Sequence, residues 1–103
     1  MADPSVLTRI GDRLRGELGA ERVIVYGSVA RGEATIHSDI DLLVVAPSEE
    51  SIYHRMARAH AVMRDLTIGL PISPLVFTPT EIQRRLSRGD HFVRDILVEG
   101  IDV

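Results

Sequence analysis

Residues 22–46, RVIVYGSVARGEATIHSDIDLLVVA, decide the fold of this chain. Residues 22–26 are β-branched and end at Gly27, a pattern that predicts a short strand. Residues 40–46 are almost continuously apolar after Asp41, which is typical of a strand covered on both faces. The polar stretch from Gly27 to Asp41 is significant because it lies between these two strands.

The flanking segments predict four longer helices and a third strand, all inferred from apolar periodicity and capping residues. Helices are expected from Pro4, with Asp3 as N-cap, to about Gly19; from Ser48 as N-cap to about Gly69; from Thr78, in a capping box with Glu81, to about Ser87; and from Asp90 as N-cap to Gly100. Residues 72–77 predict a strand whose Pro74 favours an edge position. Arg55, Arg58 and Arg64 are expected away from the apolar stripe of their helix.

This element order predicts one α/β (α+β) domain over residues 1–103, a small mixed β-sheet with helices packed mainly on one face. The 12 basic residues are all arginine, and the chain has no Lys, Cys, Trp or Asn. The lack of Cys excludes disulfides and thiolate chemistry, and the lack of Lys excludes Schiff bases and a Walker A loop. No apolar run approaches the roughly 18 residues of a membrane span, so we expect no membrane association and a cytoplasmic protein.

A net charge of −3 lacks the basic excess of proteins whose main task is to bind phosphate backbones, which argues against nucleic-acid binding. The Arg84, Arg85 and Arg88 cluster is interpreted as a solvated helix face, with an acidic partner or RNA as the alternative.

The chemistry is expected between Gly27 and Asp41. Gly27 allows a sharp turn and a close approach of backbone to a ligand, and a short helix beginning at Ser28 would present its amides and hydroxyl to a phosphate. Asp39 and Asp41 stand two apart at the start of a strand and therefore point to the same face. Two carboxylates so placed repel one another unless a cation such as Mg²⁺ or Mn²⁺ lies between them.

The pattern of a strand, Gly27-Ser28, ten residues and then Asp39-Ile40-Asp41 in an apolar strand resembles the nucleotidyltransferases related to DNA polymerase beta. The chain is similar in size and element order to the minimal nucleotidyltransferases (MNT type). This resemblance implies that Gly27 and Ser28, with Arg31 as a weaker candidate, hold a nucleoside triphosphate, most simply ATP. It also implies that Asp39 and Asp41 are the catalytic carboxylates that hold the divalent metal.

One departure from the family concerns a third carboxylate, which members that transfer nucleotides usually carry on the next strand. Residues 67–80, TIGLPISPLVFTPT, contain no acid, and Ser73 is expected near the vacant place. A hydroxyl is a poor base and a weak metal ligand, so this loss would cost on the order of 10²- to 10⁴-fold in rate. Asp65, Asp90, Glu99 or an acid of a partner are the alternatives.

Two functions therefore stay open. The first is an enzyme that transfers a nucleoside monophosphate to a hydroxyl acceptor, which is on a partner protein or another molecule. The second is a nucleotide-binding module with weak or lost turnover that acts as the antitoxin or partner of a helical HEPN-type protein, because the resemblance implies such a partner. A homo-oligomer is a further alternative.

Overall fold

The computed structural model of the chain describes residues 4–103. The elements along the chain are α1 (Pro4–Leu18), β1 (Arg22–Tyr26), α2 (Gly27–Ala30), β2 (Ile40–Val45), α3 (Ile52–Val62), a 3-10 turn η1 (Arg64–Leu66), β3 (Ile72–Phe77), α4 (Pro79–Ser87), α5 (His91–Glu99) and β4 (Ile101–Asp102). The expected cap at Asp3 lies outside the described residues. No helix within the described range is long and apolar enough to cross a membrane.

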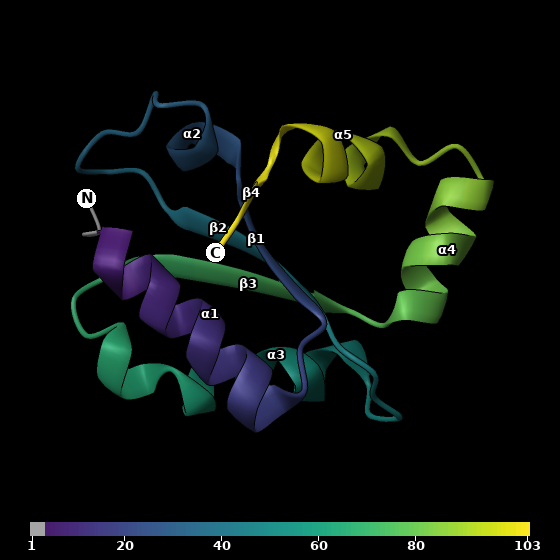
Figure 1. Cartoon of the computed structure of the whole chain (residues 1–103), viewed down its shortest axis with the longest axis horizontal. Coiled ribbons are helices and arrows are strands. Elements are labelled where there is room, and N and C mark those ends of the chain that lie inside the picture. The colour runs from purple at the N-terminus through teal and green to yellow at the C-terminus, as the bar shows by residue number, and fades with distance from the viewer. Residues whose placement is uncertain (1–3) are drawn as a thin grey trace.

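The strands form one mixed sheet in the order β3-β2-β1-β4 (Figure 1). β1 pairs antiparallel with both β2 and β4, whereas β2 and β3 run parallel. The mixed sheet and the α+β class agree with the sequence prediction, and β3 with its Pro74 lies at an edge as expected. β4 was not predicted from sequence, because two exposed residues carry no periodicity.

The two faces of the sheet carry separate hydrophobic clusters. The larger cluster packs α1 and α3 against one face, and its buried side chains include Ile10, Leu14, Val25, Leu42 and Met63. The smaller cluster packs α4 and α5 against the other face around Ile24, Leu43, Phe77, Val93 and Ile96, so helices cover both faces rather than mainly one face as the sequence predicted. Since side chains alternate along a strand, Asp41 shares the face of Leu43, so the acidic end of β2 opens on the α5 side.

Helix capping follows the sequence at two of three positions. Thr78 and Glu81 form the expected capping box, and the Asp90 side chain accepts a hydrogen bond from the Val93 amide. Ser48 was the wrong choice for α3, which begins at Ile52 with Ser51 as its N-cap. Ser48 instead accepts a hydrogen bond from the Glu50 amide in the turn before the helix. Two serines that both suit a cap cannot be distinguished by local preference alone.

The helix expected to reach Gly69 is shorter than predicted. α3 ends at Val62, and the 3-10 turn η1 follows it. Met63 is fully buried between the two segments, so the apolar periodicity continues through the break in the helix. This continuity is the reason that the pattern predicted one long helix.

Candidate functional site

The turn between β1 and α2 brings backbone against a carboxylate. Gly27 adopts a φ of +73°, a left-handed conformation that favours glycine. A Cβ built on Gly27 would lie 2.6 Å from Oδ2 of Asp41. The pairing of Tyr26 with Asp41 across the antiparallel ladder produces this approach. Any larger residue at this position would have to displace the Asp41 side chain.

α2 is a single helical turn, in agreement with the short helix expected there. Its carbonyls are used locally, because Gly27 O accepts from the Arg31 amide at 3.1 Å and Ser28 O accepts from the Glu33 amide at 2.9 Å. The amides of a first helical turn have no partner within the helix. Ser28 is half-buried and follows Gly27 directly in this turn.

The structure brings Asp39 close enough to Asp41 for the two charges to interact, although only Asp41 lies within β2. Asp39 is exposed immediately before β2, whereas Asp41 is half-buried within it. Burial raises the pKa of the Asp41 carboxyl, the nearby charge of Asp39 raises it further, and Arg31 partly opposes the change. A cation between the two carboxylates would relieve this repulsion. The donor set fits Mg²⁺, which normally takes one or two carboxylates together with phosphates of the substrate.

Ser73 occupies the position opposite Asp41 on the neighbouring strand. The parallel register pairs these two residues, and the Ser73 side chain is exposed on the same face. Within residues 4–103 no group of three or more His, Asp or Glu side chains is placed to hold a metal ion. Ser73, which the sequence analysis expected near the position of the missing third carboxylate, is therefore the residue that pairs with Asp41.

The acids considered as replacements lie elsewhere. Asp65 receives two hydrogen bonds from Arg13, at 2.6 and 3.1 Å, beside α1. Asp90 caps α5 and forms an ion pair with Arg85 at 3.1 Å. Glu99 is closer to the site, because it lines a pocket that also contains Gly27.

Arg31 follows α2 directly and its side chain is exposed. Its Nε donates to Oε1 of Glu33 at 3.3 Å, an ion pair in solvent that contributes little to stability. Burial and the charge of Asp39 raise the pKa of Asp41, and the positive charge of Arg31 partly opposes this rise, so Arg31 acts on the Asp41 carboxylate. A guanidinium held this loosely can exchange Glu33 for an anionic ligand.

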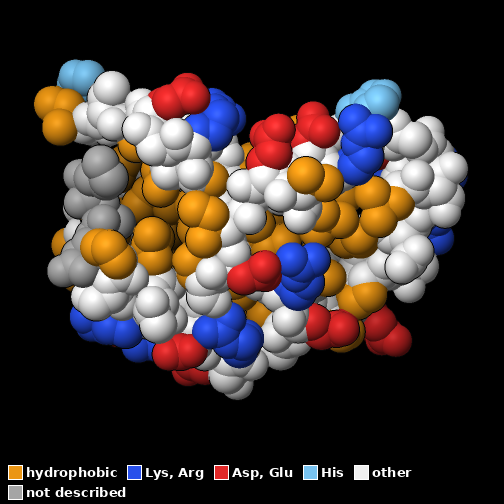
Figure 2. Space-filling model, turned by 45° about the horizontal axis from the view of Figure 1, so that its top comes forward, with side chains coloured by type: hydrophobic (Ala, Val, Ile, Leu, Met, Phe, Trp, Pro, Cys, Tyr) orange, Lys and Arg blue, Asp and Glu red, His pale blue; other side chains and the backbone are white. Residues whose placement is uncertain are grey.

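A pocket of about 280 Å³ opens between α2 and α5. Its lining consists of Tyr26, Gly27, Ala30, Arg31, Phe92, Asp95, Ile96, Glu99 and Gly100. The rings of Tyr26 and Phe92 meet edge to face with centroids 5.8 Å apart. Figure 2 shows a notch on this side of the molecule, with a basic side chain over α2 and acidic side chains over α5.

Of the α5 residues that line this pocket, sequence reasoning singled out Glu99 alone, as a possible replacement for the third carboxylate. Phe92, Asp95, Ile96 and Glu99 recur at three- and four-residue steps and therefore lie on one side of α5. That signal was present, but nothing local indicated that this side of α5 faces α2. The pocket adjoins Asp41, because Tyr26 pairs with Asp41 across the ladder; burial, followed by the charge of Asp41, raises the pKa of Tyr26.

A family model for the nucleotidyltransferase domain matches residues 7–103. This chain belongs to the nucleotidyltransferase domain family. It is 36% identical over 66 residues to a candidate protein adenylyltransferase of Methanocaldococcus jannaschii, a match that covers 58% of this chain and 43% of that protein. The match thus spans less than half the length of the relative. The resemblance noted from Gly27-Ser28 and Asp39-Ile40-Asp41 is confirmed at the level of the family.

A solved structure from Sulfolobus solfataricus, described as a candidate nucleotidyltransferase, also matches this chain. The superposition covers 78% of this chain and 77% of the other, with a TM-score of 0.49 and 23% sequence identity. Family membership implies nucleotidyl transfer from a nucleoside triphosphate as the general reaction.

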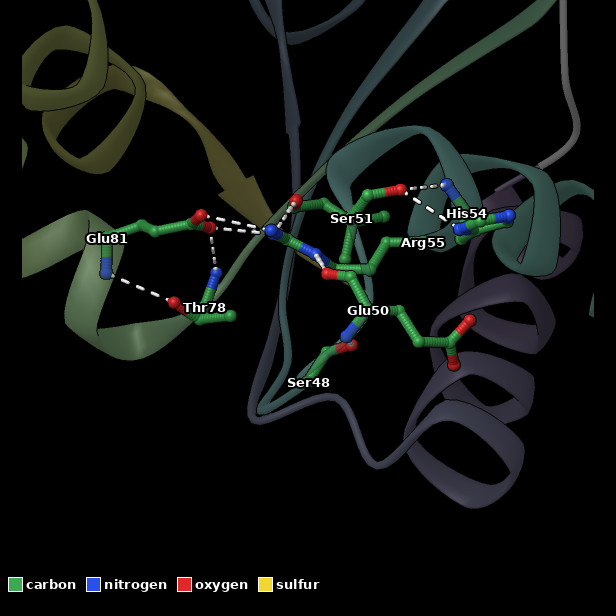
Figure 3. Close-up of polar contacts among 8 residues, drawn as sticks. Ser48, Glu50, Ser51, His54, Arg55, Thr78 and Glu81 are labelled. Atoms are coloured by element: carbon green, nitrogen blue, oxygen red, sulfur yellow. Dashed lines mark hydrogen bonds and ion pairs between the residues drawn. The ribbon is translucent and has the colours of Figure 1, made fainter.

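This nucleotidyltransferase domain has a second polar cluster at the opposite end of β3 (Figure 3). Arg55 is 7% exposed, so its expected place away from the apolar stripe was wrong. Its guanidinium donates to both carboxylate oxygens of Glu81 at 2.6 and 3.0 Å and to the carbonyls of Glu50 and Val76. The cluster joins α3 to α4 across the edge of the sheet.

The hydrogen bonds from Arg55 are the main reason that the pKa of Glu81 falls from 4.5 to about 2. The arginines of α4 lie beside this cluster. Arg85 stacks over the ring of Phe77 at 4.4 Å and pairs with Asp90, whereas Arg84 and Arg88 are exposed, in agreement with a solvated helix face.

Proposed function

We propose that this chain binds a Mg²⁺–nucleoside triphosphate at Gly27 and Ser28 and transfers the nucleoside monophosphate to a hydroxyl group of an acceptor. The observation that supports the proposal is the close approach of the Gly27 backbone, at the start of α2, to the carboxylate of Asp41. Backbone amides of this kind bind phosphate oxygens, and Arg31 adds a positive charge nearby.

The reaction we propose is an in-line displacement. The acceptor oxygen forms a bond to the α-phosphorus, the bond from that phosphorus to its bridging oxygen breaks, and pyrophosphate leaves. Asp39 and Asp41 would hold the metal, which neutralises charge on the phosphates when bound. Ser73 cannot serve as the base, so the acceptor's proton passes to solvent or to a group that the acceptor supplies.

ATP is the donor that we propose, with a hydroxyl of a partner protein as acceptor. The Methanocaldococcus relative is named as a candidate protein adenylyltransferase, which supports both choices. Ser73 is exposed on the edge strand β3, so an acceptor presented by a separate protein could reach this edge.

Calorimetric titration of Mg²⁺–ATP, followed by an assay for pyrophosphate release, tests this proposal. We expect saturable binding that requires the metal and that is lost in an Asp39→Asn, Asp41→Asn double variant. Asp12→Asn is the matched control, because it removes an exposed carboxylate from α1 on an unrelated surface. Equal binding by all three proteins would contradict the site assignment.

A second function is favoured by one observation, the hydroxyl of Ser73 in the place of a third carboxylate. Such a chain would bind nucleotide with little or no turnover and act as the partner or antitoxin of a HEPN-type protein. The same titration distinguishes the two functions. Metal-dependent ATP binding without pyrophosphate release, in the presence of a candidate acceptor, supports the binding module over the enzyme.

A further inference from the structure

The pocket between α2 and α5 adjoins the proposed phosphate site but has a different chemical character. It shares Gly27 and Arg31 with that site, and the rest of its wall comes mainly from Tyr26 and α5. We propose that this pocket holds the base of the donor nucleotide and that Asp95 and Glu99 select bases with an exocyclic amino group. This inference rests on the proposed function, since it extends the same bound nucleotide.

Size and wall chemistry are the first support. A volume of about 280 Å³ accommodates one planar ring system but not a folded peptide segment. Tyr26, Phe92 and Ile96 provide flat or apolar surfaces, and Phe92 remains 50% exposed although its edge-to-face contact with Tyr26 holds the ring. A half-exposed aromatic ring at the mouth of a pocket can stack on a base.

The charged side chains around the pocket indicate how a bound nucleotide would be oriented. Asp95 and Glu99 lie on the α5 wall of the pocket, and Arg31 lies on the α2 wall. A polyphosphate would be repelled by the two carboxylates and attracted to Arg31 and the α2 amides. The uncharged end of the nucleotide therefore points toward α5, where the carboxylates accept hydrogen bonds from amino groups.

The positions of Asp95 and Glu99 in α5 lower the stability of the folded protein. Asp95 and Glu99 are four residues apart in α5, an arrangement in which like charges repel. Glu99 also lies in the last turn, where the helix dipole disfavours a negative charge. The Asp95 side chain has only an exposed partner, Arg94, at 3.7 Å, and the Glu99 side chain takes part in no hydrogen bond or ion pair within residues 4–103. A ligand that donates to both would compensate for this arrangement.

The experiment compares three probes by calorimetry in the presence of Mg²⁺: ATP, UTP and inorganic tripolyphosphate. For the wild type we expect ATP to bind more tightly than UTP, which carries no amino group, and tripolyphosphate to bind most weakly. Phe92→Ala should weaken ATP and UTP by about 5- to 100-fold, as loss of base stacking does, and leave tripolyphosphate unchanged.

An Asp95→Ala, Glu99→Ala double variant should bring the affinities for ATP and UTP to within about twofold of each other. Val98→Ala is the matched control, because Val98 lies on α5, is 77% exposed and does not line the pocket. If Phe92→Ala does not fold, Phe92→Leu keeps the apolar volume without the ring and replaces it in the comparison.

The outcomes separate the two proposals. If none of the three probes binds the wild type, the proposed function fails. If all three bind the wild type equally and Phe92→Ala changes nothing, nucleotide phosphates bind but the base lies outside this pocket, and the inference is overturned. A preference for ATP that survives in the double variant overturns the role given to Asp95 and Glu99.

Discussion

Replacement of Gly27 by alanine separates backbone strain from damage to the proposed site. The φ of +73° costs an L-residue roughly 1–2 kcal/mol, and about 1 kcal/mol lowers the Tm of a domain of this size by roughly 4–8 °C. Gly89→Ala is the matched control, because Gly89 has a φ of +75° and no atom within 4 Å of a Cβ built there. Both variants should lose comparable stability.

Only Gly27→Ala should lose the site. Its new methyl group would meet Oδ2 of Asp41 at 2.6 Å, so the carboxylate must rotate away from its position beside α2. Displacement of a metal ligand or of its support typically costs about 10- to 100-fold in affinity. Calorimetric titration with Mg²⁺–ATP and thermal unfolding measure the two effects on each variant.

Two results would refute this reasoning. If Gly27→Ala binds Mg²⁺–ATP as tightly as the wild type, the contact between the Gly27 backbone and Asp41 has no part in binding. If Gly89→Ala loses binding to the same extent as Gly27→Ala, general strain rather than the local clash is responsible. A selective loss in Gly27→Ala, at matched Tm, supports the proposed site.

Three further changes test the charges of the molecule. Ser73→Asp supplies a carboxylate opposite Asp41, and we expect pyrophosphate release to rise by about 10²-fold or more. The control Ser73→Asn should stay at the wild-type rate. Equal rates for Ser73→Asp and the wild type would show that the missing third carboxylate does not limit turnover. Burial and then the charge of Asp39 raise the pKa of Asp41 in the folded protein, so the contribution of this group to stability is present at low pH and is lost as the pH rises. At pH 7 without metal, Asp41→Asn should therefore unfold at a higher urea concentration than the wild type. A lower urea midpoint for Asp41→Asn would contradict this. Hydrogen bonds from Arg55 lower the pKa of Glu81 from 4.5 to about 2, which gives stability that is present above about pH 4.5 and is lost as the pH falls toward 2. Across that range, the urea midpoint of Glu81→Gln should therefore change less with pH than that of the wild type. Glu17→Gln, which removes an exposed carboxylate of α1, should follow the wild type. Identical profiles for all three proteins would rule out the ion pair of Arg55 and Glu81 as a source of acid sensitivity.

Much of the fold could be predicted from local features. The β-branched run of residues 22–26 and the apolar run of residues 40–46 became strands, and the Thr78 capping box opened α4 as expected. These features depend on neighbours within a few residues, so the sequence carries them directly. The choice of Ser48 rather than Ser51 as a cap was wrong because both serines satisfy the same local rule.

Arg55 illustrates what local reasoning misses. A charged side chain off the apolar stripe predicts solvent exposure, but this guanidinium is buried because Glu81 and two backbone carbonyls supply partners for it. Glu81 comes from a different helix, far along the chain. Burial of an arginine depends on such a partner and cannot be inferred from its own helix.

The candidate site divides in the same way. By itself, the sequence determined that a strand ends at Gly27, that Asp39 and Asp41 stand two apart where the next strand begins, and that no acid lies between Asp65 and Glu81, because local patterns and composition need no distant contact. Only the tertiary structure decided that Asp41 contacts the Gly27 backbone and that Ser73 lies opposite it. It also decided that α5 lies against α2 to form a pocket. These three relations depend on strand register and helix docking between distant segments, which the burial of two hydrophobic clusters fixes only when the whole chain has folded.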